Sequence, residues 1–100
     1  MMIKVGMLVS MIEVRDGLGR PRYWKTAEVV GVEDGLVVVS YYKSFKDEER
    51  TIKRMRVRDL ENFTKKDLEV SVKNYYAYMK EFGDHKCEEW KLLKELGYVN

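Results

Sequence analysis

The 100-residue sequence is poor in several features, and each shortage excludes a class of protein. A single cysteine, Cys87, excludes a disulfide framework and is typical of proteins in a reducing compartment. The longest apolar runs, such as Leu36 to Val39, fall far short of the ~20 residues that cross a bilayer. The first residues carry one lysine and no long apolar stretch, so no signal peptide is predicted. We therefore expect a soluble, cytoplasmic protein without a membrane partner.

The sequence also has little excess of either charge, because 19 Lys and Arg are balanced by 17 Asp and Glu, which gives a net charge of +2. A balance this close does not by itself predict a nucleic-acid partner. All the arginines precede residue 63, so the positive bias belongs to the first part of the chain. Arginine is the better cation for bidentate contact with carboxylate or phosphate.

A β-hairpin between Tyr23 and Tyr42 is the strongest local prediction. Asp34-Gly35 separates two β-rich runs there, and Asp-Gly favours the type I′ turn whose twist matches the flanking strands. Gly31 within the first of these runs indicates a bulge or a sharp bend.

Further strands are predicted on both sides of this hairpin. Met7 to Val14 forms one, and Arg50 to Val57 forms a fourth, followed by a turn and a brief last strand that ends near Phe63. Apolar residues alternate irregularly in the fourth strand, which predicts a second bulge near Lys53-Arg54.

Two helices are predicted after residue 63. Thr64 and Asp67 form a capping-box start, and Gly83 suits the end of the first helix. Its apolar stripe consists of Leu68, Val72, Tyr75, Tyr76, Met79 and Phe82. Asp84 is the expected cap of a shorter second helix that stops at Gly97. Short amphipathic helices are unstable alone, so they pack on the strands or on another chain, and a homodimer through them remains open.

Three groups of residues before position 63 suggest a family. They are Trp24-Lys25-Thr26-Ala27-Glu28-Val29 at the second strand, Val39-Ser40-Tyr41 at the third, and Arg58-Asp59-Leu60 near the end. Over residues 6–62 the chain resembles the Tudor/agenet group of SH3-like barrels. We therefore expect an α+β fold, with an SH3-like (Tudor-like) five-stranded β-barrel over residues 1–63. A C-terminal helical hairpin over residues 64–100 is expected to pack on the barrel in a single compact domain.

The resemblance implies an aromatic cage that holds a methylated lysine or arginine through cation–π attraction. The family positions match Trp24, either Tyr41 or Tyr42, and Phe45. An aromatic residue that many members carry late in the first strand is absent here. The alternative is that Trp24 and the tyrosines cover the barrel mouth or receive the helices. In both cases they predict an apolar surface suited to a partner.

Cations crowd the fourth strand and the first loop. The strand carries Arg50, Lys53, Arg54, Arg56 and Arg58, and the loop region carries Arg15, Arg20 and Arg22. A strand of this kind can track a phosphate backbone, as small barrels often do. Acidic residues flank the strand and reduce its field, and a loop rich in arginine is also compatible with simple solvation.

Catalysis is not expected. Only residues 84–88 gather His, Cys and carboxylates. On a helix, His85 and Cys87 would lie about 200° apart and would not form a nucleophile and base pair. One His and one Cys also fall short of the four ligands of a structural zinc site. We expect no cofactor and no metal.

Two binding functions remain. The first is a non-enzymatic protein–protein interaction module, with Trp24, Tyr41, Tyr42 and Phe45 as apolar anchors and Arg54, Arg56 and Arg58 as charged contacts. The alternative is RNA or DNA binding through the basic strand and first loop, with Arg15, Arg20, Arg22, Arg50 and Lys53 as contacts. The chain is short, lacks glutamine and is rich in Lys, Glu, Tyr and Met. In these respects it resembles many small bacterial and phage proteins, including phage proteins that bind and disable a host factor.

Overall fold

The structure is a computed structural model that describes residues 2–83 and 86–100. The strands in this part of the chain are β1 (Leu8–Arg15), β2 (Pro21–Glu33), β3 (Leu36–Tyr41), β4 (Thr51–Met55) and β5 (Leu60–Asn62). A 3-10 helix, η1 (Val57–Asp59), joins β4 to β5, and α1 (Lys65–Phe82) and α2 (Glu88–Glu95) follow.

The five strands form one antiparallel sheet in the order β4-β3-β2-β1-β5. Within the described residues β4 and β5 are its two edges and do not pair with each other, so the sheet is open. The prediction of an α+β fold with a five-stranded sheet and two C-terminal helices is confirmed, whereas closure of the sheet is not observed.

The predicted hairpin between β2 and β3 forms, with Asp34 and Gly35 at its turn. Asp34 and Gly35 have φ angles of 50° and 77°, the two positive values that a type I′ turn requires. The register between β2 and β3 shifts between Val29 and Gly31, so the predicted bulge is confirmed. It allows the long strand β2 to bend.

The second predicted bulge is wrong, because β4 pairs with β3 without a register shift from Thr51 to Met55. The irregular pattern has a different cause. Met55 is buried in the core, but Ile52 is 59% exposed and packs on no core. Ile52 is an apolar residue at an exposed edge position, and it does not indicate irregular pairing.

One face of the sheet curls around an apolar core to which every strand contributes. Its buried members are Val9, Met11, Ala27, Val29, Val37, Val39, Tyr41, Met55 and Leu60. Met55 and Leu60 belong to opposite edges of the sheet, and only η1 and its flanking residues separate them in sequence. The sheet is therefore strongly bent although its edges do not pair.

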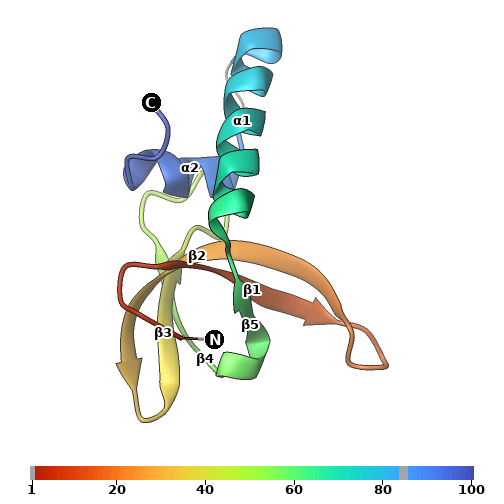
Figure 1. Ribbon diagram of the computed structural model, residues 1–100, viewed down its shortest axis with the longest axis vertical. Coiled ribbons are helices and arrows are strands. Elements are labelled where there is room, and N and C mark those ends of the chain that lie inside the picture. Colours follow the sequence, from red (N-terminus) through yellow and green to blue (C-terminus); the bar gives the residue numbers. More distant parts are fainter. Residues whose placement is uncertain (1, 84–85) are drawn as a thin grey trace.

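The other face of the sheet receives the helices, both of which lie on one side of it (Figure 1). A second core forms there from Leu8, Tyr42, Tyr75, Leu92, Leu93 and Val99. Leu92 and Leu93 of α2 are among the most buried side chains. The helices cross rather than lie antiparallel, and α1 rises past α2 away from the sheet (Figure 1).

The predicted capping of α1 is confirmed. The Thr64 hydroxyl accepts from the Asp67 amide at 3.1 Å, and the Asp67 carboxylate accepts from the Thr64 amide at 2.8 Å. Gly83 ends the helix with a φ of 75°. The upper part of its predicted stripe is not covered, because Tyr76 and Phe82 are exposed.

The start of α2 differs from the prediction. The helix begins at Glu88, and Cys87 occupies the N-cap position without a side-chain capping bond. Asp84, the expected cap, lies outside the described residues, as does His85. In residues 2–83 and 86–100, no helix is long and apolar enough to span a membrane.

Candidate functional site

The four predicted aromatic anchors do not share a surface. Trp24 of β2 is 48% exposed, but both tyrosines are buried. Tyr41 lies in the core inside the curled sheet, and Tyr42 lies in the second core, between the sheet and the helices. Phe45, in the loop between β3 and β4, is half-buried. Trp24 is therefore the only one of the four that is widely accessible, and the two tyrosines are not available as surface anchors.

Tyr42 instead holds α2 on the sheet. Its hydroxyl donates a hydrogen bond to Glu95, and Lys91 Nζ lies 4.5 Å from the centre of its ring. The hydrogen bond to Glu95 raises the pKa of Tyr42, and the same bond, followed by the charge of Arg50, lowers the pKa of Glu95. The alternative in which a tyrosine receives the helices therefore describes Tyr42.

Arg50, one of the cations predicted to contact nucleic acid, is structural. Its guanidinium lies 2.7 Å from Glu28 of β2 and 3.0 Å from Glu95 of α2. Burial opposes its charge, but the hydrogen bonds with these two carboxylates outweigh burial and raise the pKa of Arg50. With a side chain only 16% exposed, Arg50 ties the sheet to α2 and is not offered to a ligand.

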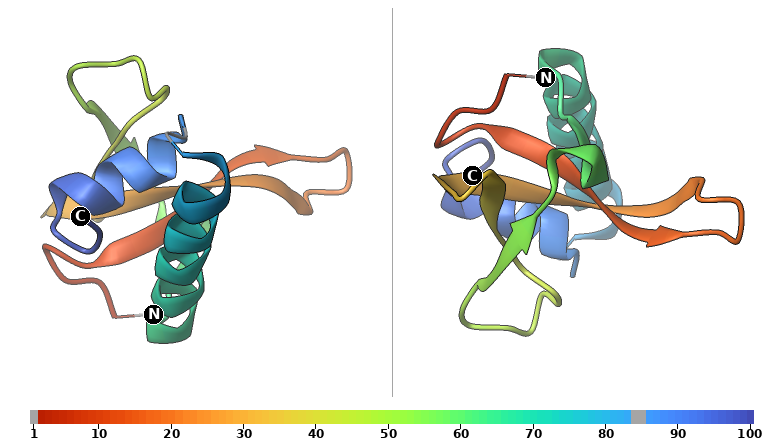
Figure 2. Two further views of the ribbon diagram at one scale, coloured as in Figure 1. Left: turned by 90° about the horizontal axis from the view of Figure 1, so that it is seen from above. Right: turned by 90° about the horizontal axis from the view of Figure 1, so that it is seen from below.

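Arg20 and Arg22 lie at the end of the arm formed by β1, β2 and the loop between them, the β1–β2 arm, which reaches out beyond the helices (Figure 2). Both are paired with Asp16 at 3.1 Å. Backbone hydrogen bonds, first from Arg20 and then from Leu18, lower the pKa of Asp16, so this carboxylate stays charged. The field of the two arginines is therefore partly neutralised within the loop.

The remaining predicted cations line a groove of about 570 Å³ between β4, η1 and the outer half of β1, here called the basic groove. Its charged walls are Arg15, Lys53, Arg54, Arg56 and Arg58, with Glu13 and Asp59 as the acidic members. The groove brings together cations that lie more than 35 positions apart in the sequence, from β1 and from β4.

Two cations of the basic groove have partners. Arg15 binds Asp59 at 3.1 Å and donates to the Arg58 carbonyl oxygen at 2.9 Å, which joins β1 to η1. Arg54 pairs with Glu33 at 2.9 Å on an exposed surface. In the described part of the chain, Lys53, Arg56 and Arg58 form no ion pair, and all three are exposed. Of the described cations that line the basic groove, these three are free to meet an external anion.

A second groove, of about 460 Å³, lies between the sheet and the N-terminal ends of both helices, and is called the Trp24 groove. Four carboxylates line it, those of Glu61, Asp67, Glu88 and Glu89. Three of them have internal partners: Asp67 caps α1, Glu88 lies 3.4 Å from Lys25, and Glu89 accepts from Ser71. Of the four, only Glu88 has a cationic partner among the described residues, so the groove keeps a net negative charge.

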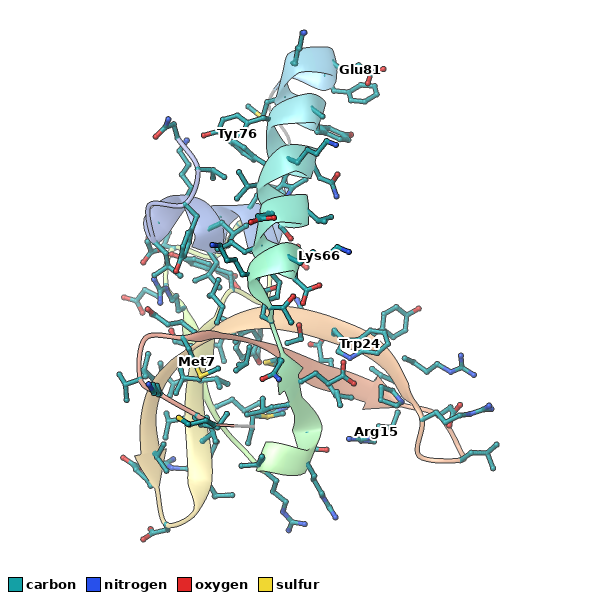
Figure 3. All side chains as sticks on the ribbon, viewed as in Figure 1. Met7, Arg15, Trp24, Lys66, Tyr76 and Glu81 are labelled. Atoms are coloured by element: carbon teal, nitrogen blue, oxygen red, sulfur yellow. The ribbon has the colours of Figure 1, made fainter. Side chains whose placement is uncertain are left out.

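The two grooves lie on different faces. Figure 3 shows Trp24 on the helix side of the β1–β2 arm and Arg15 on the opposite side, near η1. The seven residues predicted for a protein partner are therefore divided between two buried cores, a loop and these two grooves.

Comparison of the chain with models of protein families, with curated proteins and with solved structures found no match. The basis for a function is consequently the geometry of the described residues themselves.

Proposed function

We propose that this protein is a binding module that holds the phosphate backbone of RNA or DNA in the basic groove. The observation that carries the proposal is the set of three exposed cations without ion pairs, Lys53, Arg56 and Arg58, along one wall of that groove. Arg20, Arg22 and Arg50 lie outside this groove and are paired with carboxylates. The cations expected from the sequence that do line it are Arg15, Lys53, Arg54, Arg56 and Arg58.

The spacing of these cations suits a polyanion. Lys53 and Arg58 are five positions apart, so their Cα atoms are separated by at most roughly 18 Å. Each strand of a duplex presents a phosphate about every 3.4 Å along the axis, so several phosphates fall within this reach. The planar guanidinium groups of Arg56 and Arg58 match phosphate oxygens in a bidentate manner.

We further propose that the sheet is an SH3-like small barrel of the Tudor kind whose edges remain apart at β4 and β5. The curling of five strands around one core supports this assignment. Small barrels of this general kind often bind nucleic acids along a cationic strand. Tyr41 and Tyr42 are buried, however, so only Trp24 and Phe45 remain accessible for an aromatic cage at the family positions.

A protein-binding role is the second candidate, and the exposure of Trp24 in its own groove favours it. Tryptophan is enriched among residues that dominate protein interfaces. In this form the protein would be a small regulatory module, of bacterial or phage origin, that docks on a host factor through the Trp24 groove.

The salt dependence of oligonucleotide binding tests the proposed function. Contact of three cations with a single strand predicts a log–log slope of about −2, so affinity falls about 20-fold between 50 and 200 mM salt. The measurement is fluorescence anisotropy of a labelled single-stranded oligonucleotide. Trp24→Ala is the control that should bind equally well. Absence of binding at 50 mM salt, or loss of binding in Trp24→Ala, would contradict use of the basic groove.

A further inference from the structure

A third cavity, independent of the basic groove, lies between the β3–β4 loop, α1 and α2. It measures about 270 Å³, and we call it the lysine pocket. Its apolar lining comes from three segments: Phe45 of the loop, Tyr75 and Met79 of α1, and Trp90 of α2. The rings of Tyr75 and Trp90 pack edge to face with centres 5.6 Å apart, which gives this wall a defined shape.

The other lining residues are cationic or weakly polar. Lys86, Lys91 and Lys94 border the pocket together with the thiol of Cys87. Within the described residues, no carboxylate lines the pocket, in contrast with the Trp24 groove. The pocket therefore combines an apolar interior with a positive rim.

Only one of these lysines is committed to the fold. Lys91 Nζ donates to the carbonyl oxygens of Phe45, at 3.0 Å, and of Asp47, which anchors the loop to α2. Lys86 and Lys94 are exposed and form no ion pair in the described part of the chain. Lys86 Nζ lies 5.5 Å from the centre of the Phe45 ring, so its charge is held at the mouth of the pocket.

We propose that the lysine pocket binds a small amphipathic carboxylate, with its apolar body against Phe45, Met79 and Trp90 and its anionic head between Lys86 and Lys94. Charge complementarity identifies the head group, because the described residues of the rim are positive and include no carboxylate. The volume has room for about nine heavy atoms, at roughly 30 Å³ for each water-sized atom. A straight-chain carboxylate of eight carbons or an arylalkanoate is of this size.

Octanoate is the probe, and 1-octanol is the uncharged control with the same body. Trp24→Phe leaves Trp90 as the only tryptophan, so its fluorescence reports on the pocket. For a ligand of this size we expect saturable binding of octanoate with a dissociation constant of about 1 mM. Octanol should bind at least about 10-fold more weakly. Equal binding of both compounds, or no binding of octanoate, would overturn the proposal.

Two further measurements separate the pocket from a general effect on the protein. In the same background, Lys86→Glu/Lys94→Glu should weaken octanoate binding at least about 10-fold, because one favourable charge contact is replaced by repulsion at each position. Lys66→Glu/Lys73→Glu on α1 makes the same charge change and should leave binding unaltered. Octanoate should also slow alkylation of Cys87, the only thiol in the chain. Equal losses in both double variants, or an unprotected thiol, would contradict the assigned position.

Discussion

Replacing Lys53, Arg56 and Arg58 together by glutamate is expected to weaken oligonucleotide binding about 100-fold at 50 mM salt. Three exposed charge-assisted contacts contribute about 1 kcal/mol each, and about 3 kcal/mol corresponds to two powers of ten in affinity. The slope of binding against salt should also approach zero, because the counterion release that it measures would be lost. Fluorescence anisotropy over a series of salt concentrations gives both quantities.

The matched control for this variant is Lys65→Glu/Lys66→Glu/Lys73→Glu on α1. It makes the same change in net charge, and Figure 3 shows Lys66 on the helix, far from η1. It should lose less than about 3-fold in affinity, since distant exposed charges are screened. Equal losses in the two triple variants would show that net charge rather than the basic groove determines binding. Because the three groove residues have no ion pair in the described chain, unfolding should not explain a loss.

Arg50→Ala is expected to destabilise the protein by about 2 kcal/mol. Removing one member of a buried ion pair typically costs 3 to 5 kcal/mol. The effect here is smaller because Glu95 is 46% exposed and water screens it. Glu28, however, is only 20% exposed and would lose its partner at 2.7 Å. Urea denaturation followed by circular dichroism measures the change in the free energy of unfolding.

Arg54→Ala provides the comparison for Arg50→Ala, because it removes an Arg–Glu pair of similar length, 2.9 Å, from an exposed surface. Its expected cost is below about 0.5 kcal/mol. If the two variants lose the same stability, Arg50 does not tie the sheet to α2 as described.

The pH dependence of Arg50→Ala has a defined sign. The hydrogen bond from Tyr42, and then the charge of Arg50, lower the pKa of Glu95 below its ordinary value of 4.5. The stabilisation from this carboxylate is therefore complete above about pH 5 and is lost as the pH falls through the lowered pKa. The difference in stability between the wild type and Arg50→Ala should shrink between about pH 5 and pH 3. A stability difference that stays constant over this pH range would show that Glu95 does not contribute to the interaction with Arg50.

Local sequence signals predicted the elements well. The Asp34-Gly35 turn, the bulge at Gly31 and the Thr64 capping box all formed as expected, because each depends on the conformational preference of a few neighbouring residues. The start of α2 and the pairing of β4 were not predicted correctly. The pattern of β4 depends on which apolar side chains are buried in the folded chain, and Ile52 is not.

The candidate site was less predictable, because it depends on contacts between distant segments. Arg50 and Arg56 look alike in the sequence, yet Glu28 and Glu95 engage the first and leave the second exposed. The sequence predicts Tyr42 as a partner-binding residue, but it is buried with Leu92 and Leu93 of α2. The lysine pocket could not be predicted from the sequence, because its apolar residues lie on three separate segments.

Mapping the bound oligonucleotide on the protein tests the central claim most directly. Backbone amide resonances of the ¹⁵N-labelled protein are followed during titration with a short single-stranded oligonucleotide. We expect the largest shifts along β4 and η1, at Lys53, Arg56 and Arg58, and at Arg15 across the basic groove. Shifts that concentrate around Trp24 and the helix N-termini would contradict the proposed function and place the partner in the Trp24 groove.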